Sequence, residues 1–237
     1  RQFNGDFQWS SVGRGKLTAR LKQFVVDASE NDETSAAPDE AVRELPALDV
    51  IADDFQLGTR RFGRLELQAS NDGGLWKLNR ILMSHPSGVF SGSGQWLTSG
   101  GKNQTELDFK VNSPDVGALL ERLGFPGAVR SASAKLEGRM GWKGSPASFD
   151  YASLSGEMQL EAAKGQFVKI DPGVGKLLSL ISLQSLPRRI TLDFRDVFSE
   201  GFAFDTIAAK LAVNRGVMST DRLQIDGTAA RVVMRGE

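Results

Sequence analysis

Apolar and polar side chains alternate along most of the chain. The period is two residues in stretches such as RLELQAS, TELDFKVN, SASAKLEGRMGW and SLSGEMQLEA, and the side chains of a β-strand leave opposite faces with that period. Turn-forming clusters such as SNDGG, SHPSG and KGSP separate these stretches. The pattern therefore predicts an all-β fold of about ten to twelve mostly antiparallel strands, each with an apolar and a polar face.

The aromatic-rich segment from Leu186 to Asp205, LPRRITLDFRDVFSEGFAFD, predicts a hairpin. Apolar residues occupy even positions up to Phe198, and the three residues Ser199, Glu200 and Gly201 then form a plausible connection. Beyond it the apolar positions change parity, which predicts a β-bulge near Asp205. The bulge would set one strand against the other, with Ile207, Ala209 and Leu211 opposite Phe194, Leu192 and Ile190.

Two segments interrupt the alternation in the same way and predict short helices over 113–124 and 171–186. They read SPDVGALL and DPGVGKLL, which indicates an internal repeat. Ser113 or Asp171 can serve as the N-cap, and the proline that follows each suits the first helical position. The second helix is apolar over most of its circumference, so it either packs in a core or touches lipid or a membrane, through Leu177, Leu178, Leu180, Ile181 and Leu183.

Residues 29–44, SENDETSAAPDEAVRE, are acidic and lack aromatic side chains. This composition predicts a solvated, disordered loop. Over the whole chain of 237 residues, 29 lysine and arginine residues balance 29 aspartate and glutamate residues. A neutral chain of this kind has no strong field for nucleic acid or for an anionic membrane.

The residues offer little for catalysis. The chain has no cysteine and one histidine, which excludes thiol chemistry and a multi-histidine metal site, and no phosphate-loop or hydrolase motif occurs. The acidic residues Asp193, Asp196, Glu200 and Asp205 are better explained as solvated charges than as paired glycosidase carboxylates. Trp76, Trp96 and Trp142 could stack on sugars, but strand tryptophans more often line a core or a groove.

Several stretches together carry a family resemblance. GLWKLNRILMSHPSGVFSGSGQW, TELDFKVNSPDVGALLERLGFPGAVR, KLEGRMGWKGSPASFDYASLSGEMQLEAAKGQFVKIDPGVGKLLSL and SLQSLPRRITLDFRDVFSEGFAFD closely resemble the C-terminal region of the YhdP family of AsmA-like proteins of Gram-negative bacteria. The resemblance begins near Leu65 and is most specific from Tyr151 to Asp205.

The resemblance implies that residues 1–237 are one segment of a curved β-groove at the C-terminal end of a longer periplasmic protein. That protein would be anchored in the inner membrane by an N-terminal helix outside this sequence. It would carry phospholipid acyl chains toward the outer membrane, where an outer-membrane protein is a candidate partner. The resemblance implies neither a cofactor nor an enzyme activity.

A groove of this kind needs an apolar lining, and strand periodicity selects the residues for it. The expected lining is Leu107, Phe109, Leu136, Met140, Met158, Leu160, Leu192, Phe194, Phe198, Phe202, Ile207 and Leu211. The same alternation would also build a closed sandwich, whose apolar faces meet each other. A non-enzymatic scaffold or assembly factor of the cell envelope and a carbohydrate-binding module therefore stay as alternatives.

Overall fold

A computed structural model describes residues 2–26, 45–73, 75–98, 103–146, 148–168, 201–228 and 230–236. These residues form thirteen strands and one helix, α2 (Val116–Arg122). The strands are β1 (Gln2–Ser10), β2 (Lys16–Val26), β3 (Ala47–Leu57), β4 (Arg60–Asn71), β5 (Leu75–His85), β6 (Gly88–Leu97), β7 (Gln104–Ser113), β8 (Val129–Arg130), β9 (Ser133–Lys143), β10 (Ser155–Phe167), β11 (Phe202–Asn214), β12 (Val217–Asp226) and β13 (Arg231–Gly236).

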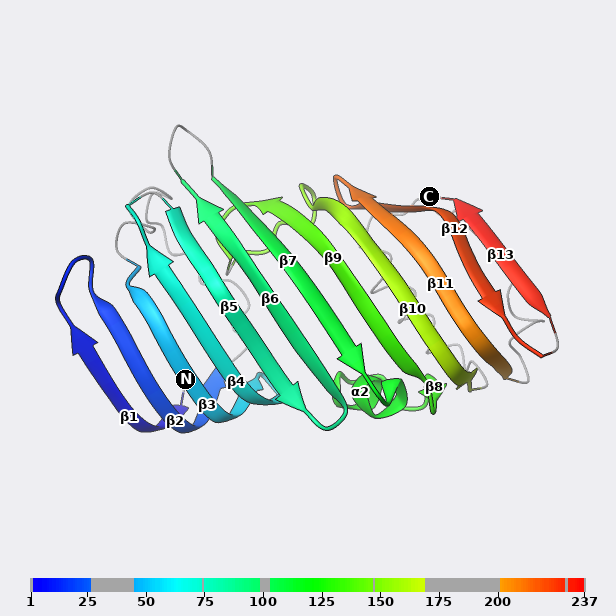
Figure 1. Ribbon diagram of the computed structural model, residues 1–237, viewed down its shortest axis with the longest axis horizontal. Helices are drawn as coiled ribbons and strands as arrows, with labels where there is room; N and C mark the ends of the chain where they lie inside the picture. The colour runs from blue at the N-terminus through cyan, green and yellow to red at the C-terminus, as the bar shows by residue number, and fades with distance from the viewer. Residues whose placement is uncertain are drawn as a thin grey trace. The chain divides into compact units, whose positions relative to one another are not determined.

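The strands belong to one sheet in the order β1-β2-β3-β4-β5-β6-β7-β9-β10-β11-β12-β13, and β8 pairs with β10 (Figure 1). β2 and β3 run parallel, whereas β1–β2, β3–β4, β4–β5, β10–β11, β11–β12 and β12–β13 are antiparallel. This confirms the predicted all-β, mostly antiparallel fold. The strands that the structure describes do not divide into the two sheets that a sandwich requires.

The chain divides into two compact units. The first comprises Arg1–His85, Val89–Phe109 and Gly141–Asp150, and the second comprises Pro86–Gly88, Lys110–Met140 and Tyr151–Glu237. Each unit has buried residues of its own on one side of its strands.

In the first unit, the core follows the strand register. Leu21 pairs with Ala52 of β3, which pairs with Leu65 of β4, and all three side chains are buried in one cluster. A second cluster contains Ala69, Trp76 and Trp96. Rows of facing apolar residues on neighbouring strands are the unit from which a sheet gains its stability.

In the second unit, the core contains Ala132, Phe202, Phe204, Ile207 and Ile225. Phe204 and Ile207 are both buried although they lie three residues apart on one strand, so the apolar face does change parity near Asp205, as the sequence indicates. The predicted bulge is wrong, because the β10–β11 register runs without a shift from Gly156↔Val213 to Phe167↔Phe202.

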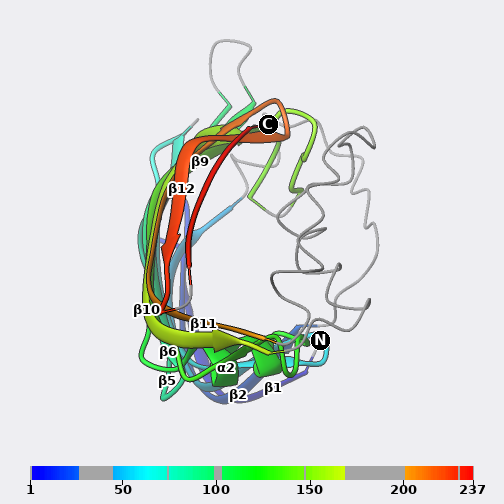
Figure 2. The ribbon, with the colours of Figure 1, turned by 90° about the vertical axis from the view of Figure 1, so that its right-hand side faces the viewer.

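The neighbouring strand explains how the parity changes without an extra residue. Lys164 of β10 adopts a φ of 54° at the same level, so both strands turn together there. Figure 2 shows β10 and β11 bending along their own length. The hairpin register is also wrong, since β11 pairs with β10 at one edge and with β12 at the other, which leaves Ile207 no free edge for Phe194.

The first predicted helix exists but is shorter, covering Val116–Arg122. Its N-cap is Asp115, whose Oδ1 accepts from the backbone N–H of Ala118 at 3.0 Å, and not Ser113. The hydroxyl of Ser113 instead donates to the backbone oxygen of Ser87 at 2.7 Å, and Arg122 Nη1 donates to Ser87 Oγ at 3.0 Å. Ser113 therefore ties the end of β7 to the β5–β6 turn.

The second predicted helix over 171–186 and the acidic segment 29–44 lie outside the described residues. Among the residues that are described, no helix has both the length and the apolar character needed to cross a membrane.

Candidate functional site

The second unit presents an apolar face that continues from strand to strand. Cross-strand pairing aligns Ala162, Ile207, Ile225 and Val232 in one row, and Leu160, Ala209, Leu223 and Met234 in the next. Met158 pairs with Leu211 on the same side of these strands. We call these residues the apolar face of the second unit.

Most side chains of this face are half-buried. Ile207, Ala209 and Ile225 are buried, whereas Leu160, Leu211 and Met234 retain intermediate exposure. The face therefore combines a tight centre with apolar surface that the described residues do not fully cover.

The opposite face of the same strands is charged and exposed. It carries Glu157, Glu161, Lys210, Arg222 and Arg231. On β7 and β9, Lys110 and Glu137 form another exposed ion pair, with 3.0 Å between Nζ and Oε2. Because these side chains are solvated, they keep this face in water and contribute little to stability.

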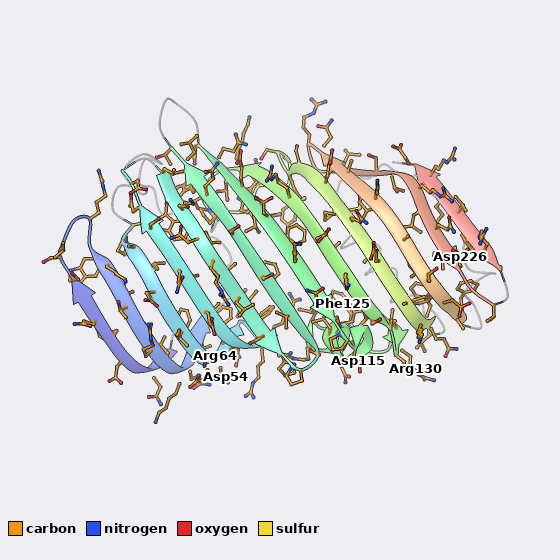
Figure 3. All side chains as sticks on the ribbon, viewed as in Figure 1. Asp54, Arg64, Asp115, Phe125, Arg130 and Asp226 are labelled. Atoms are coloured by element: carbon orange, nitrogen blue, oxygen red, sulfur yellow. The ribbon has the colours of Figure 1, made fainter. Side chains whose placement is uncertain are left out.

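A hydrogen-bonded chain crosses the charged face from β11 to β13. Gln224 Nε2 donates to Asp226 Oδ2 at 2.6 Å, Arg222 Nη2 donates to Gln224 Oε1 at 2.5 Å, and Arg231 pairs with the Asp226 carboxylate. Asp226 is labelled in Figure 3. Thr206 Oγ1 lies 3.4 Å from the same carboxylate. The hydrogen bond from Gln224, followed by that from Arg231, lowers the pKa of Asp226 below its ordinary value of 3.8, although desolvation acts in the opposite direction.

The first unit repeats this division between its two faces. Leu17, Leu48, Ala69 and Leu78 form one apolar row, and Ala19, Val50, Leu67 and Ile81 form another. The other side carries ion pairs between Arg20 and Asp49 (3.0 Å), Arg64 and Asp53 (2.5 Å), and Arg80 and Glu66 (3.6 Å), with Arg64 labelled in Figure 3.

The edge strand of the first unit leaves part of the apolar face in the open. Phe7 pairs with Ala19 and Trp9 with Leu17, so both aromatic side chains lie on the apolar side. Their exposed fractions are 64 % and 57 %. Large exposed apolar side chains in a row mark a surface that contacts other apolar groups.

The sequence-predicted lining residues that the structure describes all lie at apolar positions of alternating strands. Phe202 and Ile207 are buried, and the others are half-buried, namely Leu107, Phe109, Leu136, Met140, Met158, Leu160 and Leu211. In the first unit Phe109 stacks on Phe90 with 6.4 Å between ring centroids. The remaining predicted residues, Leu192, Phe194, Phe198 and the helix residues Leu177, Leu178, Leu180, Ile181 and Leu183, lie outside the described part of the chain.

The sequence reading overlooked residues of the same face. Phe204, Leu223, Ile225, Val232 and Met234 pack with Ile207 but were not among the predicted lining. The alternation in LQIDGTAARVVM was the available signal. The apolar rows of β2 to β5 were also absent from the prediction.

The alternative sites find little support in the geometry. Trp76, Trp96 and Trp142 are buried, and their indole N–H groups donate to Pro46 O, Asn103 Oδ1 and Ser145 O. A sugar platform needs exposed rings. Asp205 is exposed, while Asp193, Asp196 and Glu200 are not described. No group of three or more metal-ligating side chains occurs within the described ranges.

A hollow of about 580 Å³ lies in the second unit where β7 ends beside β9, β10 and β11. Most of the residues that line it have small side chains, and Ile207 of the apolar face also lines it. The lining is Asn112, Ser113, Pro114, Ser133, Ala134, Lys135, Glu161, Ala162, Ala163, Thr206, Ile207 and Ala208.

These features define a class of protein whose described strands form one sheet and, in each unit, separate an apolar face from a charged face. The model of the YhdP protein family matches residues 1–237, and the chain belongs to that family. This confirms the resemblance seen in the sequence. No solved structure matches the chain.

A curated relative supports the same family assignment. The chain is 31 % identical over 178 residues to the "Intermembrane phospholipid transporter YhdP" of Escherichia coli strain K12. The match covers 75 % of this chain and 14 % of the relative. The chain thus spans about a seventh of the length of that protein.

Proposed function

We propose that this chain is the outer-membrane-proximal segment of a periplasm-spanning lipid-transfer protein, and that its apolar face carries phospholipid acyl chains between the inner and outer membranes. The observation that carries the proposal is the continuity of the apolar rows from strand to strand, with ion-paired charges on the opposite side. Membership of the YhdP family and the name of the relative from Escherichia coli support it.

The physical chemistry of the transfer is simple. Each acyl CH₂ group gains about 0.8 kcal/mol when it leaves water for an apolar surface, so a chain stays on the apolar face while its headgroup remains in water. Motion along the rows needs no bond to be made or broken. We therefore propose passive transfer without enzyme activity, with the direction set elsewhere in the longer protein.

We also propose where this segment lies in the cell. The longer protein would be anchored in the inner membrane by an N-terminal helix, and this segment would lie in the periplasm near the outer membrane or an outer-membrane protein. The ligand is phospholipid, and the balanced charge of 29 basic against 29 acidic residues gives no reason to expect nucleic acid.

Photo-crosslinking in cells tests the proposal on two adjacent residues. Leu160 lies on the apolar face and Glu161 on the charged face of β10. A photo-reactive residue at 160 in the longer protein should capture phospholipid, whereas one at 161 should not. Equal capture at both positions would refute a lipid path along the apolar face.

A second experiment blocks the path. In the longer protein, Leu136→Asp introduces a charge on the apolar side of β9, while Glu137→Leu changes the neighbouring exposed residue. A carboxylate across the path imposes a desolvation barrier of several kcal/mol. Leu136→Asp should therefore fail to complement a deletion strain at normal protein abundance, and Glu137→Leu should complement it. Complementation by both variants would contradict the proposal.

A further inference from the structure

Two methionines in the second unit lie over glycines of the neighbouring strand. A Cβ atom placed on Gly138 of β9 would lie 2.9 Å from Cγ of Met158 on β10. Reciprocally, a Cβ on Gly156 of β10 would lie 2.9 Å from Sδ of Met140 on β9. Each methionine therefore occupies the space that a side chain on the opposite strand would fill.

The glycines are fixed by the backbone and not by the methionines alone. A Cβ on Gly138 would lie 2.4 Å from the backbone oxygen of Glu157, and one on Gly156 would lie 2.1 Å from that of Arg139. Real Cβ atoms do not approach an oxygen so closely. At this point of β9 and β10, the side-chain cover of the apolar face accordingly comes from Met140 and Met158.

This part of the face differs in stiffness from the part around Ile207. Ile207 and Ile225 are β-branched, buried and held in a cluster, and such side chains have few rotamers. Met140 and Met158 are half-buried, unbranched, and free to turn about three side-chain bonds. Because each methionine lies over a glycine, its side chain can turn aside and deepen the apolar surface without displacing a second side chain.

Resting on the proposed function, we propose that Met140 and Met158 form the adaptable section of the lipid path that admits acyl chains bent by a cis double bond. A bent chain needs extra width at the bend. A surface of leucine and isoleucine would have to strain to provide that width. A methionine over glycine can rotate aside instead.

The test uses a pair of lipids that differ only in the bend. Dioleoyl and dielaidoyl phosphatidylethanolamine have the same chain length and number of double bonds, cis in the first and trans in the second. The purified chain is incubated with equal amounts of both in mixed detergent micelles, and mass spectrometry measures the ratio of cis to trans lipid that it retains.

The decisive variant is Met140→Leu/Met158→Leu, which keeps the volume but stiffens both side chains. Its cis-to-trans ratio should fall about fivefold, the effect of roughly 1 kcal/mol, and each single variant should show a smaller fall. Gln159→Leu is the control, because Gln159 lies on the exposed side of β10 between Met158 and Leu160; its ratio should equal that of the unaltered chain.

The outcomes separate the two proposals. An unaltered chain that retains neither lipid would remove the proposed function and this inference together. A chain that retains both lipids, with the same ratio in the double variant, would remove the inference alone. An equal fall in Gln159→Leu would show that the ratio does not depend on the two methionines. Loss of the fold in the double and both single variants would assign the methionines to packing. Either result would overturn the inference.

Discussion

Ile207 of β11 lies directly opposite Ile225 of β12, and the two side chains are 9 % and 4 % exposed. Val232 of β13 continues the row beyond Ile225, and Ala162 of β10 continues it beyond Ile207. The pair forms the stiff centre of the second unit, since two β-branched side chains meet there in a close-packed cluster.

Truncating this centre should be costly. Ile207→Ala removes buried methyl and methylene groups, so the free energy of unfolding should fall by about 2–4 kcal/mol. Urea denaturation followed by circular dichroism measures it. Ala208→Ser, at the exposed neighbouring position, should stay within about 0.5 kcal/mol of the unaltered chain. A loss equally small for Ile207→Ala would show that the row is not a core.

The β11–β12 turn should accept a stabilising substitution. Arg215 and Gly216 connect the paired residues Asn214 and Val217, with φ angles of 49° and 77°. Two positive φ values are the pattern of a type I′ turn, which prefers Asn-Gly. Arg215→Asn should raise the free energy of unfolding by several tenths to about 1 kcal/mol, visible as a higher melting temperature.

The matched variant at that turn should act in the opposite direction. A Cβ on Gly216 would lie 2.5 Å from the backbone oxygen of Tyr151, so Gly216→Ala should lower the melting temperature. A decrease for Arg215→Asn would show that the arginine side chain contributes more than the backbone preference.

The Asp226 network predicts a specific pH dependence. Because the pKa of Asp226 is lowered below 3.8 by Gln224 and Arg231, the ionised carboxylate favours the folded state above that pH. The contribution disappears as the pH falls through the lowered pKa. Asp226→Asn should therefore destabilise the chain at neutral pH, and the difference in unfolding free energy should shrink as the pH falls below 3.8 and through the lowered pKa.

Nuclear magnetic resonance titration of the Asp226 carboxyl carbon measures the pKa directly. A pKa at or above 3.8 would contradict the network as the cause.

The four tryptophans should respond differently to a quencher in water. Trp9 is largely exposed, whereas Trp76, Trp96 and Trp142 are buried. Trp9→Phe should remove most of the emission that acrylamide quenches and shift the remaining emission to shorter wavelength. Trp76→Phe should leave the quenchable part unchanged. Strong quenching that persists in Trp9→Phe would show that a buried indole is open to solvent.

The alternation was sufficient to place half-buried residues. Leu107, Leu136, Leu160 and Leu211 are each half-buried between exposed neighbours, because a period of two follows directly from the pleat of a strand. Their role as groove lining stays a prediction. The positions of Trp76 and Trp96 in strands followed from the same pattern.

The alternation does not predict which strands pair with each other. β11 pairs with β10, which ends more than thirty residues earlier in the chain, whereas sequence reasoning favours a neighbour joined by a short turn. The change of parity at Asp205 predicts a bulge when β11 is considered alone, because one strand does not reveal the positive φ of Lys164 on the neighbouring strand.

The helix N-cap shows a similar limit. Ser113 and Asp115 both have side chains that suit an N-cap, and both flank Pro114. The choice depends on Ser87, whose backbone oxygen accepts from the Ser113 hydroxyl. A contact between residues 26 positions apart therefore decides which residue is the N-cap. The local sequence does not predict that contact.

The parallel pairing of β2 and β3 sets a minimum length for the chain that joins them. Lys16 pairs with Ala47 and Val26 with Leu57, so the chain must travel back the length of the pair, roughly 33 Å at 3.3 Å per residue. An extended chain needs about ten residues for that journey. Removing residues 29–44 as a whole would leave too few, and the two strands could no longer keep this register. A neutral, equally long replacement would preserve it, so topology constrains the length of the acidic segment and leaves its composition free to diverge.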